Sequence, residues 1–365
     1  MRALVVFALL AAATAVAEAY PQYQLASDVT CTGCHLSPAG GGLLTENGLA
    51  VAESSAWRGN DPKFLHGALE LPGWLELGGD ARLAAGMVDN GKASGAAYPM
   101  QAELHASAGA RGFSLTVDGG VRRPNEDTGI ASAFWSREHY VMWQQAPGET
   151  EGLFVRAGRF APVYGLRFAE HVAYTQRYGG SPLYAEAYGA SVEYVARAFE
   201  VHATGFVHDP IATAWEKGDG GALYAEVRLS EHAALGAEGK YASASDQQVA
   251  YGGITGKLYL PGPDVLLQGE GELVRRSITG DKATSVIGYL LATRKFSYGV
   301  MADIAVGHYQ ADTRVAGLYR DAIDVNVHWF ETSHLEWLLT TRLELLDHGA
   351  GTNGGYALIQ VHYRL

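Results

Sequence analysis

The stretch LELGGDARLAA, residues 75–85, alternates apolar with charged or small side chains along its length. Successive side chains of a β-strand point to opposite faces, so Leu77 and Leu83 belong to an apolar face. Glu76, Asp80 and Arg82 belong to the opposite face, which is charged. The stretch therefore predicts a strand with one apolar face and one wet face.

This period of two recurs as far as the C-terminus. Residues 265–273, 323–329 and 357–365 each alternate aliphatic side chains with polar ones. A soluble sandwich also has one wet face on each sheet. Here, however, acidic, basic and histidine side chains stand at mid-strand on nearly every segment, and aromatic ones lie near strand ends. That distribution is typical of a barrel with lipid outside and water inside.

Residues 74–365 contain about sixteen such segments of roughly ten residues. Two of them, residues 134–145 and 285–294, alternate poorly. The predicted starts lie near Trp74, Tyr98, Phe113, Phe134, Leu153, Tyr184, Phe199, Gly221, Ala233, Val249, Val265, Ser285, Tyr298, Arg320, Leu335 and Gly355. We therefore predict an all-β chain, a roughly 16-stranded transmembrane outer-membrane β-barrel.

The predicted connections alternate between tight turns and longer polar loops. Outer-membrane barrels have short periplasmic turns and long extracellular loops, so both termini are expected on the periplasmic side. The longest connection, residues 161–182, contains Arg167, Glu170, His171 and Arg177. It either folds into the lumen as a plug or stays at the surface as a solvated loop, and the sequence leaves both open.

Residues 1–19 are predicted to be a cleaved signal peptide. Arg2 precedes an apolar run, and Ala17-Glu18-Ala19 matches a cleavage site before Tyr20. A retained N-terminal anchor is the alternative. The formal net charge of −12 makes nucleic acid a poor partner and favours cations or a basic protein.

Residues 20–73 lack the alternation and hold the only two cysteines, in the sequence CTGCH. The C-x-x-C-H pattern is that of c-type haem attachment, in which two thiols bond the porphyrin edge and the histidine reaches the iron. Cys31 and Cys34 are thus predicted to form thioethers with one haem c, and His35 is predicted to be its proximal ligand. A thioredoxin-like redox pair, a zinc half-site and a simple disulfide are the weaker alternatives.

The sixth ligand of the haem iron is not fixed by the sequence. His66 is the nearest candidate after the motif, because no methionine lies between His35 and Met87. Met87, Met100, His105 and His139 are the other candidates. A short helix is expected near residues 45–52.

In its layout the chain resembles the fused outer-membrane cytochrome–porins, a family of monohaem proteins implicated in iron(II) oxidation. The resemblance lies in residues 31–48, CTGCHLSPAGGGLLTENG, and in residues 158–178, GRFAPVYGLRFAEHVAYTQRY. It implies electron transfer from extracellular ferrous iron, through the haem, to a periplasmic carrier such as a soluble cytochrome c. It also implies possible iron(II) oxidase activity, with the haem segment plugging the lumen.

Two other functions remain open at this stage. One is the same architecture passing electrons outward to an extracellular acceptor. The other is a diffusion porin that carries a tethered periplasmic cytochrome module. Acidic lumen positions, Glu76, Asp80, Glu103 and Asp118, would concentrate cations in either case.

Overall fold

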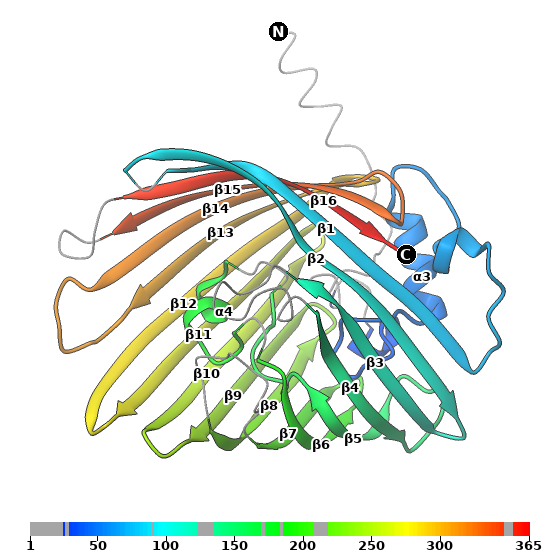
Figure 1. Ribbon diagram of the computed structural model, residues 1–365, viewed down its shortest axis with the longest axis horizontal. Helices are drawn as coiled ribbons and strands as arrows, with labels where there is room; N and C mark the ends of the chain where they lie inside the picture. Colours follow the sequence, from blue (N-terminus) through cyan, green and yellow to red (C-terminus); the bar gives the residue numbers. More distant parts are fainter. Residues whose placement is uncertain are drawn as a thin grey trace, which may run out of the picture.

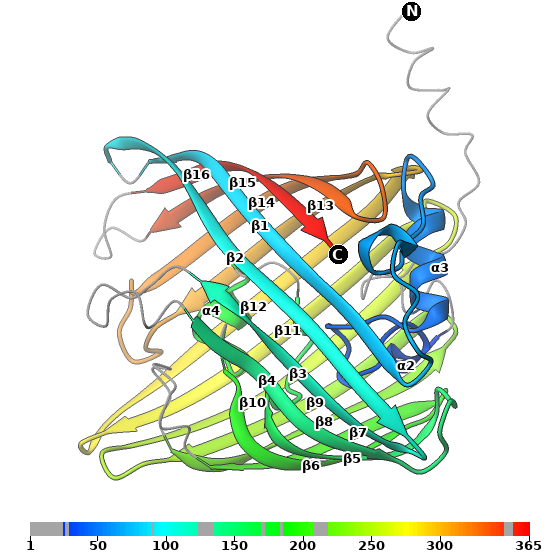
Figure 2. The same ribbon diagram turned by 45° about the vertical axis from the view of Figure 1, so that its right-hand side comes forward.

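The computed structural model describes Leu25 and residues 29–89, 91–122, 134–168, 172–182, 185–207, 218–346 and 353–365. The predicted signal peptide, residues 1–19, and the predicted strand start at Tyr184 lie outside these residues. The chain forms a closed barrel in which each strand pairs antiparallel with its sequence neighbours and β16 returns to β1 (Figures 1 and 2).

The predicted fold class is confirmed, and each predicted start lies within five residues of an observed one, the largest difference being Tyr98 against Ala93. The strands are β1 (Leu75–Asp89), β2 (Ala93–Ala110), β3 (Phe113–Arg122), β4 (Phe134–Gln144), β5 (Gly152–Phe160), β6 (Ala187–Val195), β7 (Phe199–Val207), β8 (Asp219–Ser230), β9 (Ala233–Ser243), β10 (Gln247–Leu260), β11 (Val265–Ile278), β12 (Asp281–Ser297), β13 (Val300–Gln310), β14 (Tyr319–Phe330), β15 (Leu335–Leu346) and β16 (Gly354–Arg364).

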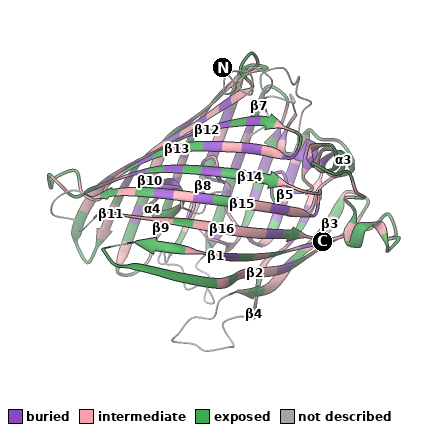
Figure 3. Ribbon diagram, turned by 90° about the horizontal axis from the view of Figure 1, so that it is seen from above, coloured by how far each residue is buried: buried purple, intermediate pink, exposed green. Residues whose placement is uncertain are grey.

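The barrel is polar inside and apolar outside. On β14 the inward Asp324 and His328 are 0% and 3% exposed, whereas the outward Ile323 is 45% exposed. Figure 3 shows this alternation of buried and exposed residues along most strands. Since soluble proteins bury their aliphatic side chains instead, the outer surface suits lipid. Among the described residues, no helix is long and apolar enough to cross a membrane.

The two poorly alternating segments are both strands, for different reasons. In β4, Arg137 is an extra residue in the pairing with β3, because Asp118 pairs with Glu138 and Gly119 with Ser136. In β12 the inward Ile287 is buried against a loop inside the barrel, so both faces of that strand are apolar. A bulge and an internal contact thus each hide the period of two.

The predicted alternation of short and long connections holds only in part. Three connections expected to be long are tight turns: those between β1 and β2, β9 and β10, and β11 and β12. The strands lengthen there, β2 having 18 residues and β12 having 17. Paired strand extensions therefore replace some of the expected loops, as the β11–β12 hairpin shows in Figure 1.

Residues 29–67, which we call the rim segment, cover the end of the barrel where β1 starts and β16 ends. We call this end the terminal rim. The segment contains α2 (Cys31–Cys34), α3 (Glu46–Ser55) and η2 (Phe64–Gly67), and α3 agrees with the helix expected near residues 45–52. Figure 2 shows α3 beside this rim. After α3, the Trp57 N–H donates to the Phe330 carbonyl over 2.9 Å, and the Arg58 N–H donates to the Glu331 carbonyl over 3.0 Å.

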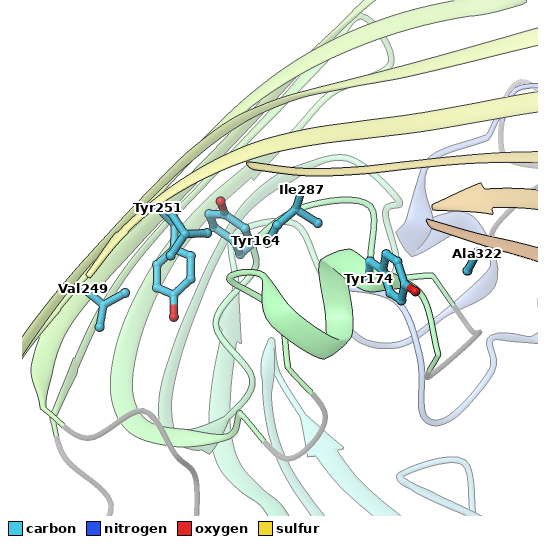
Figure 4. Packing of buried hydrophobic residues seen from close by; sticks show 7 residues of the cluster. Tyr164, Tyr174, Val249, Tyr251, Ile287 and Ala322 are labelled. Atoms are coloured by element: carbon cyan, nitrogen blue, oxygen red, sulfur yellow. The ribbon is translucent and has the colours of Figure 1, made fainter. Parts of the chain in front are cut away.

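Residues 161–186, which we call the inward loop, connect β5 to β6 and enter the lumen with α4 (Tyr174–Tyr178) (Figure 1). Tyr164 and Tyr174 are fully buried against inward side chains of the wall, including Tyr251 and Ile287 (Figure 4). The question that the sequence left open is thereby decided: this loop folds inward. Glu170 and His171 lie outside the described residues.

Candidate functional site

The CxxCH motif occupies one helical turn. Cys31 and Cys34 begin and end α2, and both thiols are free. Residues three apart on a helix lie on the same side, so the two thiols share one face. The His35 N–H closes the turn by donating to the Cys31 carbonyl over 2.9 Å. The backbone therefore presents two thiols and an imidazole together.

The His35 ring is oriented by a glycine loop. Nδ1 of His35 lies 3.1 Å from the Gly41 carbonyl oxygen. Gly40, Gly41 and Gly42 all have positive φ, at 73°, 72° and 60°, which residues with a Cβ adopt only at a cost. Within the described part of the chain, Nε2 of His35 makes no hydrogen bond. Burial lowers the pKa of His35 to about 4, so the ring is neutral near pH 7 and its Nε2 lone pair is available.

The residues after the motif clamp its backbone. The Thr45 hydroxyl and the Asn47 side-chain amide each donate to the Gly33 carbonyl over 3.0 Å. The Asn47 amide also lies 3.7 Å from the Cys34 sulfur. Thr45 is at the same time the N-cap of α3, accepting from the Gly48 N–H over 3.1 Å. The start of α3 thus fixes the turn that carries the cysteines.

The motif lies in the lumen against side chains of β5, β7, β8 and β10. The Arg228 guanidinium of β8 donates to the Val29 carbonyl over 2.5 Å. The Arg156 guanidinium of β5 donates to the Ser37 hydroxyl over 3.5 Å. Burial and the nearby Glu200 raise the pKa of the Cys31 thiol to about 12. Side chains from several strands therefore surround the motif.

The inward loop is held by carboxylates of the wall and reaches the motif. The Tyr164 hydroxyl and the Gly180 N–H donate to Glu272 over 3.0 and 2.9 Å, and the Leu166 N–H donates to Glu270 over 2.8 Å. Burial and Glu272 hold the pKa of Tyr164 well above its usual value, so this hydroxyl remains a donor. These contacts hold the loop to the wall both before and after α4.

Arg167 extends from this loop toward the motif. A Cβ at Gly40 would lie 3.5 Å from an Arg167 guanidinium nitrogen, and the charge of Arg167 acts on both Cys31 and His35. Arg167 has a φ of 47°, an uncommon conformation for a residue other than glycine. In the described residues its guanidinium has no ion pair or hydrogen bond. Among the described residues, this cation therefore faces the CxxCH turn with no anionic partner.

The structure does not bring His66 beside the motif. Its Nδ1 lies 3.3 Å from the Asn60 side-chain amide, and its Nε2 lies 3.0 Å from the Tyr363 hydroxyl. Its ring also packs against His334 at 4.0 Å between centroids. These partners belong to the rim segment, the β14–β15 turn and β16, whereas the motif faces the opposite strands. As a sixth ligand, His66 remains a prediction that its contacts do not favour.

The other candidate ligands lie on the wall. Met87 is 61% exposed. His139 Nε2 lies 3.1 Å from the Tyr188 hydroxyl. His105 is flanked by Asp80 and Asp118. Sequence reasoning considered these residues one by one and missed two groupings: the approach of Arg167 to the motif, and the cluster around His105.

Comparisons with known proteins bear on the fold. No protein-family model matches the chain, and no curated protein matches it in sequence. OmpF of Salmonella typhi aligns with a TM-score of 0.63 at 12% identity, over 80% of this chain and 97% of that one. An anion-selective porin of Comamonas acidovorans aligns with a TM-score of 0.62 at 12% identity, over 80% of this chain and 99% of that one. OmpT of Vibrio cholerae aligns with a TM-score of 0.59 at 14% identity, over 80% of this chain and 97% of that one. The chain thus has the fold of outer-membrane porins.

Proposed function

We propose that this porin-fold barrel transfers electrons at the outer membrane through one haem c, bound covalently by Cys31 and Cys34 and ligated by His35. The observation that carries the proposal is the position of the CxxCH turn within the lumen, with Nε2 of His35 free. Two thiols on one turn and a neutral imidazole form a donor set that fits haem attachment. When bound, the haem supplies reversible one-electron chemistry.

The residues around the motif suit the charges of a haem. Arg167 and Lys257 both act on Cys31, but Lys257 pairs with Glu226 at 2.8 Å, whereas Arg167 has no anionic partner among the described residues. The guanidinium of Arg167 is therefore the cation that would interact with the charge of a haem attached at this turn. A Cβ added at Gly40 would lie 4.0 Å from Cδ2 of His35, so this glycine borders the ring that would ligate the iron.

Extracellular ferrous iron is the proposed electron donor, and a soluble periplasmic cytochrome c the proposed acceptor. In this arrangement the terminal rim faces the periplasm, and the motif lies at the end of the lumen nearest the carrier. Inward carboxylates, including Glu103, Asp118 and Glu200, would attract cations from the other end. Iron oxidised on the outer side would then form its poorly soluble ferric state away from the periplasm.

A second candidate is a diffusion porin with an attached cytochrome segment. It is favoured by the fold similarity, because the neighbours include a protein described as an anion-selective porin. The rim segment and the inward loop both occupy this lumen, which would narrow a diffusion path. Conductance in planar bilayers separates the two functions: a large open-channel current favours diffusion, and a small or absent current favours electron transfer.

The test of electron transfer starts from protein purified from outer membranes. We expect a haem-stained band on denaturing gels, and we expect it to vanish in the double variant Cys31→Ala, Cys34→Ala. That variant should still show heat-modifiable migration, because the cysteines lie outside the strands. Anaerobic ferrous iron should convert the visible spectrum of the wild type to the reduced form.

Two results would contradict the proposal. A stain retained by the double variant would exclude attachment at these cysteines. A stained protein whose spectrum does not respond to ferrous iron would exclude iron as the donor, and the outward direction of electron flow would then be tested with reduced cytochrome c.

A further inference from the structure

A cluster of mixed donors projects into the lumen near the terminal rim, on the first two strands. Asp80 comes from β1, and Glu103 and His105 come from β2; Asp80 and Glu103 lie opposite each other in the strand register. One oxygen or nitrogen of each side chain lies within 4.8 Å of the other two. Nε2 of His105 is 3.1 Å from an Asp80 oxygen. The cluster therefore gathers one imidazole and two carboxylates around one point.

Each member of the cluster is oriented by another side chain. The other nitrogen of His105, Nδ1, lies 2.9 Å from an Asp118 oxygen on β3. The Gln101 amide donates to the second Asp80 oxygen over 2.8 Å. The Arg137 guanidinium donates to Glu103 over 3.5 Å. Metal-binding histidines characteristically have their second nitrogen held by a carboxylate in this way.

A second buried histidine shows that this convergence is not general. His328 lies 2.8 Å from Asp303 through Nε2 and 2.8 Å from Glu336 through Nδ1. Like His105, His328 thus has one carboxylate at each ring nitrogen, but among the described residues no third ligating side chain lies near the same point. The His328 contacts are those of an ion-pair chain, whereas the His105 cluster has a third donor, Glu103, near the same point.

The chemistry of the donors indicates which ions would bind. Glu103 and Asp118 are 3% and 6% exposed, so these carboxylates have lost most of their water. Neutral His105 with ionised Asp80 and Glu103 would carry a charge of −2, part of which is offset by Arg82, 3.7 Å from Asp80, and by Arg137, 3.5 Å from Glu103. An imidazole with two carboxylates suits Mn²⁺, Fe²⁺ or Zn²⁺, whereas Ca²⁺ prefers oxygen ligands alone.

We propose that Asp80, Glu103 and His105 bind one divalent transition-metal cation in the lumen near the terminal rim, with Asp118 positioning His105. This site does not require the haem, so the proposal is independent of the proposed function and is tested separately from it. It gives the lumen a specific ligand set for a metal in addition to a general attraction for cations.

The test uses Mn²⁺ as the probe and the full chain purified in detergent. The room-temperature six-line signal of free Mn²⁺ in electron paramagnetic resonance falls when the ion is bound, so a titration gives stoichiometry and affinity. We expect one Mn²⁺ bound per chain, displaced by equimolar Zn²⁺ and not by a tenfold excess of Ca²⁺. His105→Ala and Glu103→Gln should each abolish this binding, and Asp118→Asn should weaken it about 10- to 100-fold.

His308→Ala is the matched control, because His308 also lies beside a carboxylate, 2.7 Å from Asp321, but has no third donor among the described residues. It should bind Mn²⁺ as the wild type does. Variants are compared only when they keep heat-modifiable migration, and the Zn²⁺ and Ca²⁺ competition on the wild type needs no variant. Absence of Mn²⁺ binding, equal displacement by Ca²⁺, or unchanged affinity in folded Glu103→Gln protein would each overturn the proposal.

Discussion

Two segments enter the same lumen, and they are held there differently. The inward loop is tied to the wall by buried side-chain charges, as in the contact of Arg342 with the Val172 carbonyl at 2.7 Å. The rim segment is held by side chains of the wall around the motif, such as Arg228 on the Val29 carbonyl, and by backbone hydrogen bonds after α3, such as the one from Trp57 to Phe330. The loop is therefore anchored by buried charges of the wall, whereas the rim segment combines wall contacts around its cysteine turn with backbone pairing after α3.

The largest effect is expected where the loop meets a buried charge. Arg342 donates to both oxygens of Asp324, over 2.6 and 2.7 Å, and both side chains are at most 2% exposed. Arg342→Ala would leave the Asp324 charge buried and unpaired, which costs about 3–5 kcal/mol. We expect the free energy of unfolding, measured by urea titration in lipid vesicles, to fall by that amount.

The rim segment offers the matched control for this change. Arg58 contacts Glu331 at 3.4 Å but is 69% exposed, so Arg58→Ala should cost less than about 1 kcal/mol. Equal losses for Arg58→Ala and Arg342→Ala would mean that the two segments are anchored alike, and the comparison would fail.

A smaller effect is expected where the two segments meet. If a haem is attached at the motif, the positive charge of Arg167 stabilises its reduced form, because the reduced haem carries one positive charge fewer. Arg167→Gln should therefore lower the reduction potential by roughly tens of millivolts, measured by spectroscopic redox titration. Arg177→Gln, on the same loop but 48% exposed beside Glu344, should leave the potential almost unchanged. A potential that both variants shift equally would place Arg167 far from the haem.

The smallest effect is expected at His66. Its Nε2 is engaged by the Tyr363 hydroxyl at 3.0 Å on the exposed rim, so we expect His66→Ala to leave the low-spin visible spectrum unchanged. His35→Ala is the comparison, because loss of the proximal ligand should convert that spectrum. A high-spin spectrum in His66→Ala would show instead that the rim segment rearranges to bring His66 to the iron.

The sequence was sufficient for the barrel and its strand positions, because the period of two is a local property of each strand. Ile323 and Asp324 fall on opposite faces whatever the rest of the chain does, and their exposures of 45% and 0% follow. The alternation of apolar and polar residues is broken at Arg137 and Ile287 for reasons that are not local to the strand. One is a bulge against the neighbouring strand, and the other is a contact with a loop far away in the sequence.

In the candidate site, too, local spacing determined some features and only the tertiary structure decided the others. The sequence alone determined that Cys31, Cys34 and His35 share a turn, because their spacing lies within one helical turn. Only the tertiary structure decided that Arg167 faces that turn and that His66 does not. It also decided that Asp80 and Glu103 stand opposite each other, with His105 and Asp118 alongside. Strand register and loop direction set these contacts, and both depend on closure of the whole barrel, which no local pattern contains.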